Sequence, residues 1–205
     1  MHNLSSKELY LVNDGQTWYI YKDGFGENYK ATKEEEAEWA KEVVANKLRL
    51  IETETNRTGL QFAIEALAYH KYEGLDDLLI KKLQEASPAR QIVFASALWE
   101  RIKCEKSFEV IYDVLIQHGD EYLNDVFLGL NNFKNNEIAK KFIIGCLEGD
   151  DDKLHLLAQR TVSMWAWSGL HAFKENNLLE DLLPGNKDSA TFKIALEKLK
   201  QVLAI

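Results

Sequence analysis

A repeated pattern of helix pairs constrains the fold of this 205-residue chain more than any other feature of its sequence. Four leucines that each end an apolar run are separated by 32, 32 and 36 residues, and they are Leu83, Leu115, Leu147 and Leu183. A second set recurs at 31, 32 and 35 residues, 16 to 18 residues before the first, and consists of Leu67, Leu98, Leu130 and Trp165. Two short helices and a turn fill such a unit, so the spacing predicts a stack of similar helix pairs.

Capping signals and the scarcity of proline set the predicted helix boundaries. Residues 32–35 (Thr-Lys-Glu-Glu) and 58–61 (Thr-Gly-Leu-Gln) have the spacing of a capping box, and Ser87 precedes Pro88 as an N-cap precedes a first helical residue. Only two prolines occur, so few helix breaks are enforced. The predicted helices are 33–52, 58–71, 75–85, 88–103, 106–117, 120–132, 135–148, 152–167, 170–182 and 188–203.

The first 31 residues have a different pattern. Residues 9–12 and 17–21 are rich in aromatic and β-branched types, and Asn-Asp-Gly at 13–15 tolerates positive φ, which together predict a small N-terminal β-hairpin. Residues 22–28 are predicted to form a turn or loop. We therefore divide the chain into 1–31, the hairpin and loop packed on the helical body, and 32–205, an α-helical repeat domain. Its repeats cover about 58–183, between capping helices 33–52 and 188–203.

The repeats resemble a known architecture. Residues 87–90 (Ser-Pro-Ala-Arg), followed by Ala95, Ala97 and Leu98, look like the second helix of a HEAT-like repeat. The resemblance implies a mainly α fold, a right-handed α-α superhelix of HEAT-like helix pairs, and it carries no function. Later units depart from the pattern, because Arg90 has no arginine counterpart and Trp165 replaces a leucine. Tetratricopeptide arrays have a similar period, but these repeats do not have their Trp, Leu-Gly and Tyr signature.

Composition and charge exclude several classes of function. Lys and Arg number 25 against 33 Asp and Glu, a net charge of −8, which disfavours nucleic acid as a partner. The two cysteines are 42 residues apart without a histidine at short spacing, so we expect neither a metal site nor a disulfide. The sequence has no run of 18 apolar residues and its start has no apolar segment, so we expect no membrane association and a cytoplasmic protein.

Catalytic patterns are missing from the sequence as well. The five histidines are scattered, and neither a His-Glu-x-x-His nor a Gly-x-Ser-x-Gly motif occurs. We therefore predict no catalytic residue, no cofactor and no enzymatic activity.

Helical geometry selects a candidate partner-binding face. A residue two positions after each core leucine lies about 200° further round the helix and so points away from the core. These residues, with those seven positions earlier on the same face, are Tyr69, Glu100, Asn132, Trp167, Phe62, Val93, Asp125 and Arg160. Of these, Tyr69, Glu100, Asn132, Trp167, Asp125 and Arg160 are the predicted partner-binding residues. Alternatively, Tyr69 and Trp167 belong to a second layer of core, Asp125 and Arg160 form a structural ion pair, and Glu100 is solvated surface.

The repeat architecture and the missing catalytic motifs favour a non-enzymatic scaffold, a monomer or weak dimer that binds a protein or peptide on one face of a short solenoid. One alternative is an acidic immunity-type or inhibitor protein that neutralises a basic toxin or nuclease through opposite charge. The other comes from the resemblance, since HEAT-like repeats include alkylpurine DNA glycosylases. Trp165, Trp167 and Asp125 could play the part of that family's aromatic residues and aspartate.

Overall fold

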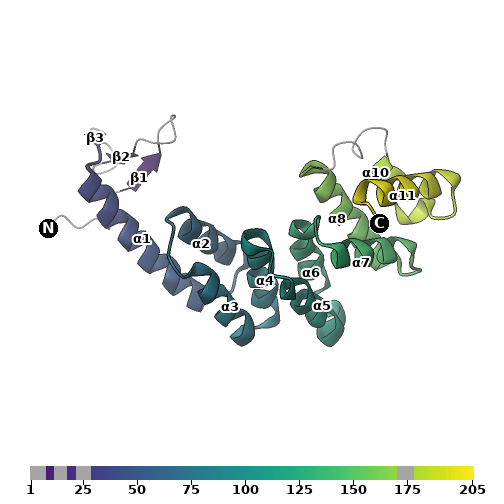
Figure 1. Cartoon of the computed structure of the whole chain (residues 1–205), viewed down its shortest axis with the longest axis horizontal. Coiled ribbons are helices and arrows are strands. Elements are labelled where there is room, and N and C mark those ends of the chain that lie inside the picture. Colours follow the sequence, from purple (N-terminus) through teal and green to yellow (C-terminus); the bar gives the residue numbers. More distant parts are fainter. Residues whose placement is uncertain (1–7, 12–17, 22–28, 170–177) are drawn as a thin grey trace. The chain divides into compact units, whose positions relative to one another are not determined.

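A computed structural model describes residues 8–11, 18–21, 29–169 and 178–205 (Figure 1). The described chain is mainly α-helical, as the sequence predicts. It divides into two compact units, Met1–Glu73 and Gly74–Ile205.

The first unit contains three short strands, β1 (Glu8–Leu11), β2 (Trp18–Tyr21) and β3 (Tyr29–Lys30). They pair antiparallel in the order β1-β2-β3, with Leu9 opposite Ile20 and Ile20 opposite Tyr29. Strand β3 was not expected from the sequence pattern. The predicted turn at 13–15, which would connect β1 and β2 into a hairpin, lies outside the described residues.

Two helices follow in the same unit, α1 (Lys33–Thr53) and α2 (Arg57–Tyr69). The predicted capping box begins α1: the Glu35 backbone N–H donates to Thr32 Oγ1 at 3.2 Å, and the Thr32 N–H donates to Glu35 Oε2 at 3.0 Å. The cap predicted at Thr58 is wrong, because the N-cap of α2 lies two residues earlier. There Asn56 Oδ1 accepts a hydrogen bond from the Gly59 N–H at 3.1 Å. The two helices pack against each other over an apolar face that buries Ile51, Leu60, Ala63, Ile64 and Leu67.

The described part of the second unit consists of helices, and those between residues 75 and 167 are joined by short connections (Figure 1). The α-helices are α3 (Leu75–Glu85), α4 (Pro88–Ile102), α5 (Lys106–His118), α6 (Leu123–Leu130), α7 (Glu137–Glu148), α8 (Asp152–Trp167), α10 (Leu178–Asp181) and α11 (Ala190–Leu203). The 3-10 turns are η2 (Gly119–Glu121), η3 (Asn131–Phe133) and η5 (Pro184–Asn186). The helix predicted over 120–132 is thus divided into η2, α6 and η3. Of the helix predicted over 170–182, residues 170–177 lie outside the described residues, and α10 is the described part.

Neighbouring helices in this unit pack on one another, α3 on α4, α4 on α5, α5 on α6 and α7 on α8, and of the predicted pairs this includes 88–103 with 106–117. Alternate helices also contact one another, α4 with α6 and α6 with α8. This arrangement is compatible with a helical repeat architecture. It leaves α6 between α4 and α8.

Hydrogen bonds and close packing fix α6 between α4 and α8. Ser96 Oγ on α4 donates to the Gly129 carbonyl at 3.2 Å, and Trp165 Nε1 on α8 donates to the Leu130 carbonyl at 3.1 Å. The side chains of the flanking helices therefore satisfy carbonyls in the last turn of α6, where intrahelical partners run out. On the α4 side the approach is so close that a Cβ at Gly129 would lie 2.6 Å from Ile92 Cγ2.

Candidate functional site

A groove of about 500 Å³ lies between α6 and α8 in the second unit. Its lining combines apolar side chains with polar ones that are mostly uncharged. The lining residues are Asn124, Phe127, Leu128, Asn131, Leu157, Gln159, Arg160, Thr161, Ser163 and Met164. Phe127 and Leu157 are buried, whereas Leu128 and Met164 are 51% and 50% exposed. A pocket of this size and composition suits a small ligand or a few side chains of a peptide.

Helical spacing explains why these side chains border the groove. On α8, Arg160, Met164 and Trp167 are separated by four and three residues and therefore form one stripe. On α6, Asn124 and Leu128 are related in the same way. The groove is thus bordered by two helix faces that the core does not cover.

Arg160 dominates the electrostatics of the groove. Among the described residues that line it, Arg160 alone carries a formal charge. The side-chain amide of the neighbouring Gln159 is held by a hydrogen bond, in which its Nε2 donates to the Leu179 carbonyl at 2.8 Å. The Arg160 guanidinium is exposed, and no side chain of the described residues forms an ion pair with it. A guanidinium in this state can take a carboxylate in a bidentate hydrogen bond.

The structure brings some of the predicted partner-binding residues together and separates others. Arg160 lines the groove, and Trp167, which is 62% exposed, continues its stripe along α8. Asn132 is exposed beside the lining residue Asn131, and Asp125 is half-buried on α6 outside the lining. Glu100 is exposed on α4 and lies outside this groove, as the solvated-surface alternative has it.

Two expectations for this face are wrong. The predicted face does not continue along α4, because Val93 is buried, 6% exposed, in a helix that is packed on several sides. The exposure of Tyr69 and Trp167 also contradicts their assignment to a second layer of core.

Trp165 has a structural role that excludes it from a binding surface. The side chain is fully buried and its indole N–H is bound to the Leu130 carbonyl. It therefore cannot act as the exposed aromatic residue that the glycosylase alternative would require. Trp167, two residues later, points to the opposite side of the helix and is exposed.

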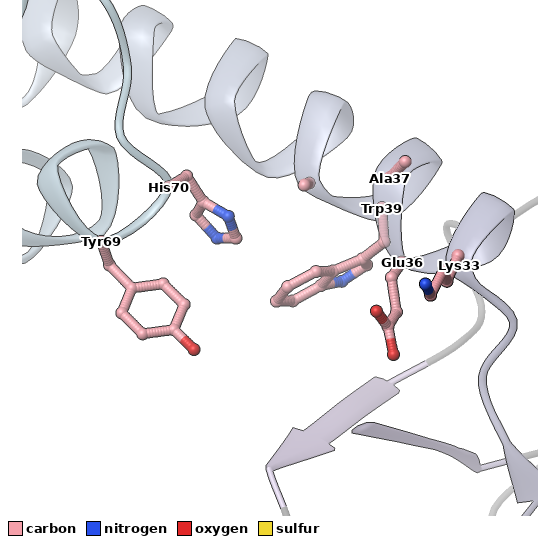
Figure 2. Close-up of a pocket in the computed structure, with 7 residues that line it drawn as sticks. Lys33, Glu36, Ala37, Trp39, Tyr69 and His70 are labelled. Carbon is pink, nitrogen blue, oxygen red and sulfur yellow. The ribbon is translucent and has the colours of Figure 1, made fainter. Parts of the chain in front are cut away.

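Tyr69 lies in the first unit and lines a different pocket, of about 430 Å³ (Figure 2). The pocket is lined by Lys33, Glu36, Ala37, Trp39, Ala40, Tyr69 and His70. Tyr69 is the last residue of α2, 58% exposed, and its ring meets the His70 ring edge-on with centroids 5.2 Å apart. The His70 ring also meets Trp39 of α1 at 5.4 Å. Burial lowers the pKa of His70, which favours the uncharged imidazole.

Trp39 was not among the residues predicted from the sequence, because one helix alone does not show what packs opposite it. The available signal was the short connection after α1, which makes α1 and α2 antiparallel neighbours. The end of α2 then has to lie near the beginning of α1. On that ground, the sequence could have predicted that Tyr69 lies near Trp39.

Two side chains elsewhere in the described chain that could act as a nucleophile or a metal ligand, Cys146 and His155, are buried. Burial raises the pKa of the Cys146 thiol to about 12, so it remains protonated and a poor nucleophile at neutral pH. His155 is buried and its Nε2 lies 2.8 Å from the Leu182 carbonyl. Within the described residues, no three His, Cys, Asp or Glu side chains are placed to hold one metal ion. None of the described helices is long and apolar enough to cross a membrane.

Comparison with known proteins identifies no family for this chain. No family model, no curated protein and no solved structure matches it.

Proposed function

We propose that this chain is a non-enzymatic binding scaffold that holds a peptide segment of a protein partner in the groove between α6 and α8. The observation that carries the proposal is the half-exposure of Leu128 and Met164 on facing helices above a buried apolar floor. Exposed apolar side chains gathered around a concavity mark interaction sites more often than isolated ones do. Methionine also adapts its shape to different apolar partners.

The polar lining specifies the chemistry of the peptide. Asn124, Asn131 and Ser163 offer donors and acceptors suited to a peptide backbone, and Arg160 offers a guanidinium suited to a carboxylate. The proposed occupant is therefore a short segment with one or two apolar side chains and an Asp, a Glu or a C-terminal carboxylate. Trp167 lies next along the α8 stripe, where a longer segment would reach it.

The proposal extends to the architecture around the groove. We infer that the helix pairs continue as a right-handed superhelix of the HEAT-like type, and that the groove lies on its binding face. The chain would work as a monomer or weak dimer in the cytoplasm, where its two free cysteines stay reduced.

A displayed library of random peptides tests the proposal directly. The full chain is used for selection, and the enriched peptides are then measured against the variant Leu128→Asp/Met164→Asp. We expect enrichment of peptides that combine apolar residues with a carboxylate, and a loss of affinity of at least about tenfold in the variant, since a carboxylate buried against apolar groups is costly. Arg160→Gln should weaken only the peptides that carry the carboxylate.

A matched control distinguishes a loss of binding in the groove from the general effect of placing charges on exposed apolar residues. Ile116 on α5 and Ile194 on α11 are also exposed apolar residues, but neither lines the groove. The variant Ile116→Asp/Ile194→Asp should bind the selected peptides as the wild type does. Equal binding by the groove variant would place the site elsewhere, and a selection that enriches no peptide would remove the scaffold function itself.

A further inference from the structure

The aromatic pocket of the first unit has a composition unlike that of the groove, and it points to a different ligand. The Trp39, Tyr69 and His70 rings meet at steep angles, with interplanar angles of 66° between Trp39 and His70 and 89° between Tyr69 and His70. The three rings line a concave space of about 430 Å³ and do not form one flat stack. Figure 2 shows the three rings next to one another at the pocket, with the Glu36 carboxylate on the far side of Trp39 from Tyr69.

Charge distinguishes this pocket from an ordinary apolar cavity. Glu36 lines it, and the first six residues of α1, 33–38, contain four glutamates and one lysine. The local field is therefore negative, which favours a cation over an anion. Lys33 also lines the pocket, but it is exposed and its flexible stem lets the ammonium group remain in water. Burial lowers the pKa of His70, which favours the uncharged ring.

The faces of tryptophan and tyrosine rings attract cations through their quadrupoles, and they also receive methyl groups. A bare metal ion does not fit this lining, because such ions require several oxygen ligands and Glu36 is the lone carboxylate among the described residues that form it. A neutral apolar ligand would not fit either, since it would desolvate Glu36 without pairing it. An organic cation with alkyl groups around the charge satisfies both the rings and the carboxylate.

We propose that the pocket formed by Trp39, Tyr69, His70 and Glu36 binds an alkylated ammonium group, with its alkyl groups on the Trp39 and Tyr69 rings and its charge near Glu36. This chemistry is common to a free quaternary amine and to a methylated lysine side chain on a peptide. The proposal does not rest on the function of the groove between α6 and α8, because no residue is shared by the two sites.

Titration of the full chain by NMR tests the proposal with the indole N–H of Trp39 as the probe. The resonance is assigned from its loss in Trp39→Phe. Choline chloride should shift it saturably, whereas 3,3-dimethyl-1-butanol, the neutral molecule of the same shape, should shift it far less. An acetylated and amidated trimethyllysine, added in a parallel titration, distinguishes the two sources: tighter binding than choline indicates a methylated side chain, and weaker binding indicates a free amine.

Variants assign the binding to the rings and the carboxylate. Tyr69→Ala removes an exposed ring and should weaken choline binding about two- to fivefold, while Tyr69→Phe keeps the ring face and should leave it unchanged. Glu36→Gln should weaken the binding of choline and leave that of the neutral alcohol unaltered. Equal binding of choline and its neutral counterpart would overturn the proposal, and so would the lack of a saturable shift with both cationic probes.

Discussion

At the scale of single residues, Gly129 determines how closely α4 and α6 pack. A side chain there would meet Ile92 Cγ2 at 2.6 Å, well inside contact distance, and Ser96 Oγ at 3.1 Å. We predict that Gly129→Ala lowers the free energy of unfolding by about 1–3 kcal/mol, because the helices must separate to admit the methyl group. Urea unfolding monitored by circular dichroism measures the change.

Gly145 provides the matched control for that substitution. It also lies within a helix, α7, but a Cβ there would meet nothing within 4 Å. Gly145→Ala should therefore raise stability by roughly 0.5–1 kcal/mol, the helix-propensity difference between the two residues. If both alanine variants changed stability in the same direction, close packing at Gly129 would not be the cause.

A second prediction at this scale concerns the two cysteines. Burial raises the pKa of Cys146 from an ordinary value of 9.0 to about 12, whereas Cys104 is half-buried. In the native protein at pH 8, Ellman's reagent should react with Cys104 and not with Cys146. Because the folded-state pKa is the higher one, Cys146 favours folding below pH 9, and its contribution is lost as the pH rises from about 9 to 12. If one thiol per chain reacts, and the Cys104→Ser variant does not react, the assignment is confirmed. Rapid reaction of both thiols would contradict it.

At the scale of the elements, the beginning of α2 shows how a correct helix can have an incorrectly predicted cap. Asn56 caps it through Oδ1, and Thr58 lies inside the first turn. We predict that Asn56→Ala costs about 1 kcal/mol of stability, because the Gly59 N–H loses its acceptor. Thr58→Ala should change the stability by no more than a few tenths of a kcal/mol. Thermal unfolding of both variants decides the matter, and a larger loss for Thr58→Ala would contradict the assigned cap.

The elements also show what a sequence of this kind can predict. The mainly helical fold could be predicted from apolar residues at helical spacing, and two of the four spaced leucines, Leu83 and Leu147, are buried as expected, whereas Leu183 is 38% exposed. The end of α6 at Leu130 could not be predicted, because its last carbonyls accept hydrogen bonds from side chains of α4 and α8 that the sequence pattern does not place there. The exposed positions Tyr69 and Trp167 followed from helical geometry alone. The burial of Val93 did not, because it depends on which neighbouring helices cover α4.

At the scale of the whole molecule, the net charge of −8 and the single arginine of the groove act in opposite directions on an acidic peptide. The net charge repels the peptide at long range and slows association, whereas Arg160 holds its carboxylate and slows dissociation. Salt screens both effects, since the Debye length falls from about 10 Å at 0.1 M to about 3 Å at 1 M.

We therefore predict that, for a carboxylate-bearing peptide bound in the groove, both rate constants increase with salt. Between about 0.05 and 0.5 M NaCl, kon should rise because repulsion is screened, and koff should rise because the Arg160 pair weakens. In Arg160→Gln the salt dependence of koff should vanish while that of kon remains, since the net charge of the rest of the chain is unaltered. Surface-immobilised peptide and flowing protein give both constants. A kon that instead falls steeply with salt would contradict the prediction, because it would show that the positive charge of Arg160 outweighs the net negative charge of the chain in steering the acidic peptide.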